Sequence, residues 1–148
     1  MTIERLHLDT RARNMGIGLI WLFHISGLIG ITFGYQDWFV TKTVLNISIV
    51  TVIFILFFPI DTKLKAIVAI LFFAVGFGVE WIGVHYDFLF GAYDYGDNFG
   101  AKFFEVPWLI GVNWMLLTFV TGAIADKFIS NFWVKIAFGA SLMVFLDF

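Results

Sequence analysis

The sequence contains no cysteine, and this absence removes several kinds of chemistry at once. Disulfides, thiolate metal sites, CxxC redox centres and cysteine nucleophiles are all excluded. Charge is also scarce, since only 14% of the 148 residues are Asp, Glu, Lys or Arg and the net charge is −2. The nine Lys and Arg residues are scattered. No basic stripe can neutralise a run of phosphates, so nucleic acid is not an expected partner.

Proline and linker sequence are equally scarce. Only Pro59 and Pro107 interrupt the chain, and no Ser- or Gly-rich tract divides it, which predicts a single domain over 1–148. Apolar residues are abundant instead: 61% of the chain is hydrophobic and 20% is aromatic. An ordinary soluble domain has about 45–50% apolar residues. The composition therefore excludes a soluble globule and predicts an integral membrane protein.

Five apolar runs account for most of the length, and one membrane crossing takes about 20 such residues. Helices are expected because a backbone exposed to lipid must satisfy its own N–H and C=O groups. The predicted class is an all-α, polytopic transmembrane helix bundle. Its expected spans are residues 15–35, 44–60, 64–84, 108–125 and a fifth that begins near 132.

The distribution of basic residues predicts how this bundle is oriented. Seven of the nine fall on one side of the predicted spans, and only Lys42 and Lys102 fall on the other. An excess of Lys and Arg marks the cytoplasmic side. We therefore expect a cytoplasmic N-terminus. The location predicted for the protein is the bacterial inner membrane. The fifth run stops at Phe148, so its helix ends flush with the far surface unless further spans follow.

Small residues recur at a spacing that suits close contact between helices. Ser26, Gly30 and Gly34 lie four residues apart in the first run, and Gly76 and Gly83 share a face of the third. These faces could pack within one chain or between copies in a homo-oligomer.

Three ionisable residues, His24, Glu80 and Asp147, lie within or at the edge of apolar runs. Such groups normally face the interior of a bundle and mark a functional path. Glu80 shares its helix face with Gly76 and Gly83, so its carboxyl should point toward a neighbouring helix. Away from water a carboxyl group favours its neutral form, which can donate a proton. The alternative roles are structural: Glu80 or His24 could join helices, and Asp147 could reach the lipid headgroups.

Residues 85–107, HYDFLFGAYDYGDNFGAKFFEVP, combine eight Tyr and Phe rings with four acids. The glycines permit tight turns, so the segment could fold over the mouth of the bundle as a lid. An aromatic belt at the membrane interface would explain the rings but not the acids. Two further candidate acids come from this segment, Asp94 and Asp97. The candidate substrate-binding side chains are Trp81, Phe90, Tyr93, Tyr95, Asn113 and Trp114.

An acid beside electron-rich rings inside a bilayer suits the protonation of an isolated alkene. Aromatic rings stabilise the resulting carbocation through their quadrupoles, and a preorganised carboxylate stabilises it electrostatically. Water held by a second polar group can then capture the cation. These parts would serve a hydratase or a cyclase that acts on a terpenoid lipid. The three histidines are too scattered to form a metal site.

The stretch EWIGVHYDFLFGAYDYGDNFGAKFFEVPWLIGVNWMLL resembles the integral-membrane carotenoid biosynthesis proteins, most strongly over residues 76–120. That family includes carotenoid 1′,2′-hydratases, which act on γ-carotene or lycopene ends, and bisanhydrobacterioruberin hydratases. The resemblance implies addition of water across the terminal C1′=C2′ bond of an acyclic carotenoid without a redox cofactor. Family relatives are longer and have further spans. The matching positions are Glu80, Gly83, Gly91, Tyr93, Tyr95, Pro107 and Trp114.

These considerations lead to one mechanistic hypothesis. Glu80, or one of Asp94 and Asp97, protonates C2′ of the carotenoid end. Tyr93, Tyr95 and Trp114 stabilise the tertiary cation at C1′, and a carboxylate partner delivers water. The partners expected are thus a carotenoid or other isoprenoid lipid and the membrane.

Two other functions are compatible with the same residues. Asp94 and Asp97 form a D-x-x-D pattern that could hold Mg²⁺ for an isoprenoid diphosphate, as in membrane prenyltransferases. Only Lys102 lies near enough in sequence to help hold the diphosphate. Alternatively, Glu80 and His24 could form a proton relay in a non-enzymatic membrane transport or pigment-binding module.

Overall fold

The computed structural model describes residues 10–86 and 91–147, which form six helices and one short β-hairpin. In chain order the elements are α1 (Thr10–Thr32), α2 (Gln36–Val40), α3 (Thr43–Phe57), α4 (Lys63–Tyr86), β1 (Lys102–Phe103), β2 (Val106–Pro107), α5 (Trp108–Phe128) and α6 (Phe132–Asp147). The predicted all-α class is confirmed. Helices α1, α4 and α5 are long and apolar enough to cross a membrane, whereas α3 and α6 are shorter apolar helices.

The first helix ends earlier than the apolar run that predicts it. The predicted span reaches residue 35, but α1 ends at Thr32 because Gly34 adopts a φ of +89°. The N–H groups of Gly34 and Tyr35 bond to the carbonyls of Ile31 and Gly30 at 3.0 and 2.9 Å. This pair of bonds is the Schellman motif, which closes a helix with glycine in the left-handed conformation.

The small-residue face predicted for the first span is therefore only partly correct. Gly34 terminates the helix instead of packing on its face, and the Ser26 hydroxyl donates to the Phe23 carbonyl of its own helix. Only Gly30 makes a close contact, because the ring of Phe39 in α2 occupies the space that a Cβ atom would take.

Proline and polar caps set several other helix ends. Phe58, which precedes Pro59, has a ψ of 132°, the extended conformation that proline imposes on the residue before it. The Thr62 hydroxyl accepts a bond from the Lys65 N–H at 3.2 Å and caps α4. The Asn131 side-chain oxygen accepts bonds from the first-turn N–H groups of α6 at 3.0 and 3.2 Å.

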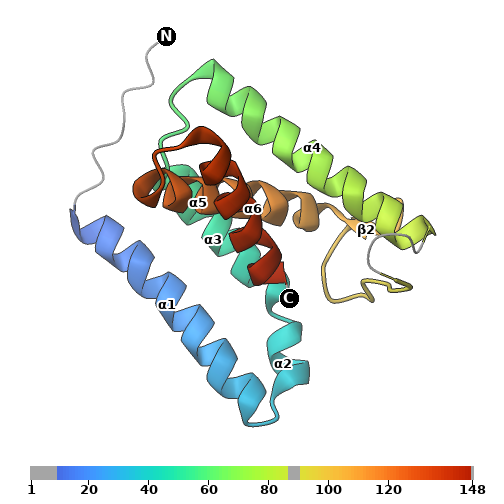
Figure 1. Cartoon of the computed structure of the whole chain (residues 1–148). Coiled ribbons are helices and arrows are strands. Elements are labelled where there is room, and N and C mark those ends of the chain that lie inside the picture. The colour runs from blue at the N-terminus through green and yellow to red at the C-terminus, as the bar shows by residue number, and fades with distance from the viewer. Residues whose placement is uncertain (1–9, 87–90, 148) are drawn as a thin grey trace.

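Helix α5 is the centre of the packing and contacts α3, α4 and α6. Figure 1 shows α6 crossing α5, α4 converging with α5 toward β2, and α1 lying at one side of the molecule. The core cluster joins α3 to α5 and consists of Phe54, Leu109, Val112 and Leu116. Helix α1 packs against α2 and α3.

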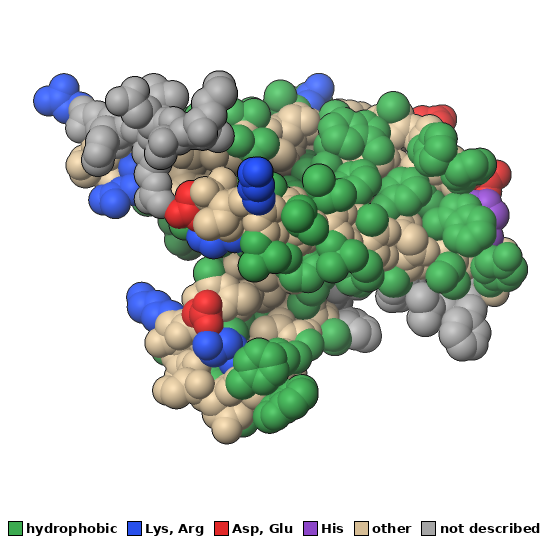
Figure 2. Space-filling model, turned by 90° about the horizontal axis from the view of Figure 1, so that it is seen from above, with side chains coloured by type: hydrophobic (Ala, Val, Ile, Leu, Met, Phe, Trp, Pro, Cys, Tyr) green, Lys and Arg blue, Asp and Glu red, His purple; other side chains and the backbone are tan. Residues whose placement is uncertain are grey.

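Most of the outer surface is apolar. Large side chains such as Leu28, Trp133 and Phe145 are 70%, 75% and 76% exposed. Figure 2 shows apolar side chains spread over the visible face, with Lys and Arg mainly on one side of it. A surface of this kind would be costly in water but matches the hydrocarbon of a bilayer. The cytoplasmic N-terminus stays a prediction.

Candidate active site

The carboxyl group of Glu80 lies at the centre of the candidate site. Glu80 belongs to α4 and is only 6% exposed. Gly76 and Gly83 of the same helix are also buried, so the face that the spacing predicts is the inward face of α4. A buried carboxylate is costly unless it is hydrogen-bonded, and its partners therefore define the site.

Three hydrogen-bond donors converge on this carboxyl group. The hydroxyls of Tyr93 and Tyr95 donate to Oε2 at 2.7 and 2.5 Å. The indole Nε1 of Trp114 donates to Oε1 at 2.9 Å. The structure thus brings together four of the residues that the sequence singled out, from α4, the segment after it and α5. We name Glu80, Tyr93, Tyr95 and Trp114 the Glu80 cluster.

Two glycines allow Trp114 to reach Glu80. A Cβ atom on Gly76 would overlap Cβ and Cγ of Trp114, so only glycine lets the indole lie this close to α4. On α5, a Cβ atom on Gly111 would lie 2.8 Å from the Phe73 ring and 3.1 Å from its carbonyl oxygen. Sequence reasoning missed Gly111, although a glycine three residues before the tryptophan on an apolar helix was an available signal for close helix packing.

Tyr93 and Tyr95 are alternate residues in the chain, and both hydroxyls reach the same oxygen of Glu80. Their rings meet edge to face with centroids 5.6 Å apart, and Tyr95 packs edge to face on Phe99 at 5.5 Å. Asp94 lies between them and is exposed. Its Oδ1 accepts the Gly96 N–H at 2.7 Å, which closes a tight turn.

The electrostatics of the site keep Tyr95 in its neutral form. Burial is the largest cause that raises the pKa of Tyr95, followed by its hydrogen bond to Glu80, the Glu80 charge and the contact with Tyr93. Burial disfavours a phenolate because it penalises the negative charge, and the neighbouring Glu80 carboxylate disfavours it by repulsion. Tyr95 is therefore a hydrogen-bond donor at physiological pH.

The hairpin of β1 and β2 anchors the chain where it returns from the tyrosines to α5. Val106 and Pro107 are fully buried, and the Trp108 N–H bonds to the Ala101 carbonyl at 3.2 Å. The turn between the strands places Phe104 and Glu105 at φ values of 48° and 66°, a conformation that L-residues rarely adopt. Glu105 also lies 3.7 Å from Nε2 of His85, near the end of α4.

Three predicted acid or base residues lie apart from the Glu80 cluster. Asp94 and Asp97 are exposed, and the Asp94 carboxylate is used in its own turn. His24 is exposed on α1, and its Nδ1 lies 2.8 Å from the Ile20 carbonyl of the same helix. Because α1 packs on α2 and α3, the structure does not pair His24 with Glu80.

The remaining predicted site residues are Asn113, Trp81, Phe90 and Asp147. Asn113 is partly buried beside Trp114 on α5. Trp81 follows Glu80 and is also partly buried, with its ring centroid 5.0 Å from that of His85. Phe90 lies outside the described residues. Asp147 is the last residue of α6, and its side chain is likewise outside the description.

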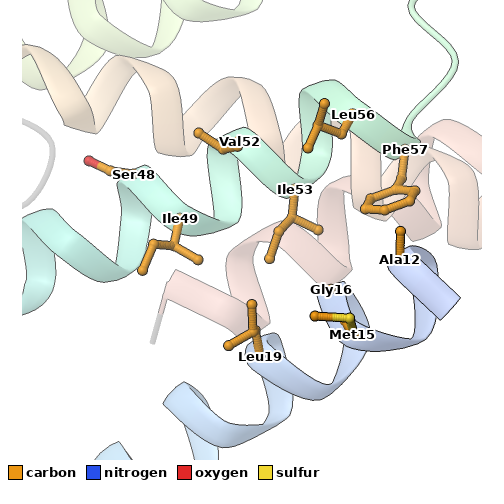
Figure 3. Close-up of a pocket in the computed structure, with 10 residues that line it drawn as sticks. All are labelled: Ala12, Met15, Gly16, Leu19, Ser48, Ile49, Val52, Ile53, Leu56 and Phe57. Carbon is orange, nitrogen blue, oxygen red and sulfur yellow. The ribbon is translucent and has the colours of Figure 1, made fainter. Parts of the chain in front are cut away.

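The described residues contain no group of three or more His, Asp or Glu side chains placed to hold a metal ion. An open cavity of about 440 Å³ lies between α1 and α3. Figure 3 shows its lining of apolar side chains, such as Met15, Ile53 and Phe57, with Ser48 as the one polar member. The cavity holds no acid or base, so it can accommodate an apolar chain but supplies no chemistry.

Comparison with known proteins places the chain in a family. A sequence model described as carotenoid biosynthesis protein matches residues 38–148, which include every member of the Glu80 cluster. No curated protein and no solved structure matches the chain.

Proposed function

The chain belongs to the carotenoid biosynthesis protein family, and from this premise we propose that it is a carotenoid 1′,2′-hydratase. The proposed reaction adds water to the terminal C1′=C2′ double bond of an acyclic carotenoid end, of the γ-carotene or lycopene type. The observation that carries the proposal is the buried carboxyl group of Glu80 beneath three hydrogen-bond donors. The substrate is a membrane lipid, and the chemistry uses an acid rather than a redox cofactor.

In the proposed mechanism, Glu80 in its carboxylic acid form donates its proton to C2′. The π electrons of the alkene form the new C2′–H bond, which leaves a tertiary cation at C1′. The departing proton leaves a carboxylate, and Tyr93, Tyr95 and Trp114 are already placed to stabilise that negative charge by hydrogen bonds. Donors preorganised for the charge that develops in the transition state lower the barrier.

The same side chains can protect the cation. The electron-rich faces of Tyr93, Tyr95 and Trp114 attract positive charge, and the Glu80 carboxylate attracts it over a short distance. Water then attacks C1′ and gives a tertiary alcohol. The alkene itself sets the regiochemistry, because a tertiary cation is far more stable than a secondary one. The protein has to admit one water and prevent loss of a proton from carbon, which would regenerate an alkene.

The geometry favours this function over the two alternatives. A magnesium-dependent prenyltransferase would need Asp94 and Asp97 to converge on a cation, but the Asp94 carboxylate is bonded to the Gly96 N–H and both residues are exposed. A proton relay for transport would need Glu80 and His24 in contact, but His24 is exposed on α1 and its Nδ1 lies 2.8 Å from a carbonyl of its own helix.

The test is to express the chain in a bacterium engineered to accumulate lycopene or γ-carotene and to analyse the pigments by chromatography with mass spectrometry. We expect a new, more polar pigment that is heavier by one water. Asp97→Asn should still give this pigment, because Asp97 is exposed and apart from Glu80. Unchanged pigment, with the protein present in the membrane, would contradict the proposed function.

A further inference from the structure

The two oxygens of Glu80 have different partners. Oε2 accepts bonds from the hydroxyls of Tyr93 and Tyr95, whereas Oε1 accepts one from the indole N–H of Trp114. A phenol oxygen can donate a proton and accept another at the same time, because it keeps lone pairs when it donates. An indole N–H is a donor only. Among the residues that the structure describes, Oε2 is therefore the carboxyl oxygen connected to groups that can pass a proton on.

Hydration creates a need for such a connection. Once Glu80 has given its proton to the alkene, it must recover one before the next turnover. The water that attacks C1′ must lose a proton at the same stage, or no alcohol forms. Because Glu80 is only 6% exposed, bulk water reaches its carboxylate poorly. A route inside the site would satisfy both needs.

We propose that Tyr95 binds the attacking water and returns the proton of that water to Glu80, an inference that rests on the proposed hydratase function. The water donates a hydrogen bond to the Tyr95 oxygen. As the water oxygen bonds to C1′, its proton moves to the phenol oxygen and the phenol proton moves to Oε2 of Glu80. The products are the tertiary alcohol, neutral Tyr95 and the carboxylic acid of Glu80, so no other reactant is consumed.

Several observations select Tyr95 for this step. Its hydroxyl donates a hydrogen bond to Oε2 of Glu80 at 2.5 Å. Its ring is partly buried and packed edge to face between Tyr93 and Phe99, which holds the hydroxyl in place. Burial and the Glu80 carboxylate raise the pKa of Tyr95, which keeps its phenol neutral. A neutral phenol, unlike a phenolate, is too weak a base to remove a proton from the carbocation.

The experiment incubates membranes containing the full chain with lycopene in deuterium oxide and analyses both alcohol and recovered alkene by mass spectrometry. The wild type should form alcohol that carries deuterium at C2′. Tyr95→Phe keeps the ring and leaves Tyr93 and Trp114 as donors to Glu80, so protonation of the alkene should slow but continue. We expect hydration to fall about 10²-fold, the scale of general acid–base catalysis. The uncaptured cation should lose a proton, so the recovered alkene should gain deuterium.

Tyr86→Phe is the matched control, because Tyr86 is 67% exposed at the end of α4 and lies outside the Glu80 cluster. It should hydrate lycopene as the wild type does, with each variant compared at equal protein in the membrane. Hydration by Tyr95→Phe at the wild-type rate would overturn the inference. An equal loss of hydration and deuterium uptake in Tyr95→Phe would also overturn it, because Tyr95 would then act in the protonation step alone. If the wild type forms no alcohol and takes up no deuterium, the result would contradict the proposed hydratase function and, with it, the proton transfer through Tyr95.

Discussion

The indole Nε1 of Trp114 lies 2.9 Å from Oε1 of Glu80, across the junction of α4 and α5. The two residues are 34 positions apart in the chain, so the contact exists only when the two helices pack. The tyrosine segment reaches Oε2 of the same group. The carboxyl is thus held by three parts of the fold, and its orientation is set before any substrate binds.

Replacing this donor should slow the reaction without unfolding the protein. Trp114→Phe keeps an aromatic ring but removes the bond to Oε1. A hydrogen bond to a charged group contributes about 1.5–3 kcal/mol, so we expect the hydration rate to fall about 10- to 100-fold. Initial rates of alcohol formation in membranes measure the effect. A rate equal to that of the wild type would show that the Trp114 bond is not used in the reaction.

Gly76→Ala should disturb both the fold and the site, because its new methyl group would overlap Cβ and Cγ of Trp114. We expect a loss of about 1–3 kcal/mol in the free energy of unfolding, the usual cost of overpacking, and a loss of activity. Gly78→Ala is the control on the same helix, since nothing lies within 4 Å of its added methyl group. Thermal unfolding in detergent compares them, and equal melting temperatures for the two variants would contradict the packing argument.

The hairpin turn stores strain that substitution can release. Glu105 has a φ of 66°. For a residue with a side chain, this left-handed conformation costs free energy of order 1 kcal/mol. Glu105→Gly should raise the free energy of unfolding by about 0.5–1 kcal/mol. The lost contact with His85 matters little, because the Glu105 side chain is 76% exposed. Glu105→Gln retains the strain and should stay within about 0.5 kcal/mol of the wild type.

Stability should fall at high pH through Tyr95. The pKa of Tyr95 is raised in the folded state, so the folded protein holds this proton more tightly than the unfolded chain. The stabilisation is complete below the ordinary tyrosine value of about 10 and is lost as the pH rises above it. Chemical unfolding at alkaline pH should show this loss in the wild type and a smaller one in Tyr95→Phe. Identical pH dependence in both would contradict the raised pKa.

Much of the site could be predicted from the sequence. The helical spacing of Gly76, Glu80 and Gly83 predicts one inward face, and all three residues are buried. Trp114 and the two tyrosines stand out because polar aromatic side chains on apolar segments need hydrogen-bond partners. The sequence does not specify that they share one partner, because that depends on how α4 crosses α5 and on the close approach at Gly76 and Gly111.

The sequence is less informative about the other candidate acid and base residues, Asp94 and His24. Asp94 is adjacent to both tyrosines in sequence, yet it is exposed and its carboxylate accepts the Gly96 N–H of its own turn. His24 stands out in the sequence because it interrupts an apolar run. In the structure it is exposed and its imidazole finds a hydrogen-bond partner in its own helix, the Ile20 carbonyl. Backbone conformation and helix neighbours decide such cases, and neither is encoded by composition.

Hydration should start with the proton that Glu80 donates to the alkene. The most direct measurement compares the wild type with Glu80→Gln, at equal protein in the membrane, for alcohol formation from lycopene and for deuterium uptake at C2′ from deuterium oxide. The amide keeps the size of the side chain and has no acidic proton to give. We expect Glu80→Gln to lose both alcohol formation and deuterium uptake while the protein remains folded. A Glu80→Gln protein that hydrates lycopene at the wild-type rate would contradict this role of Glu80.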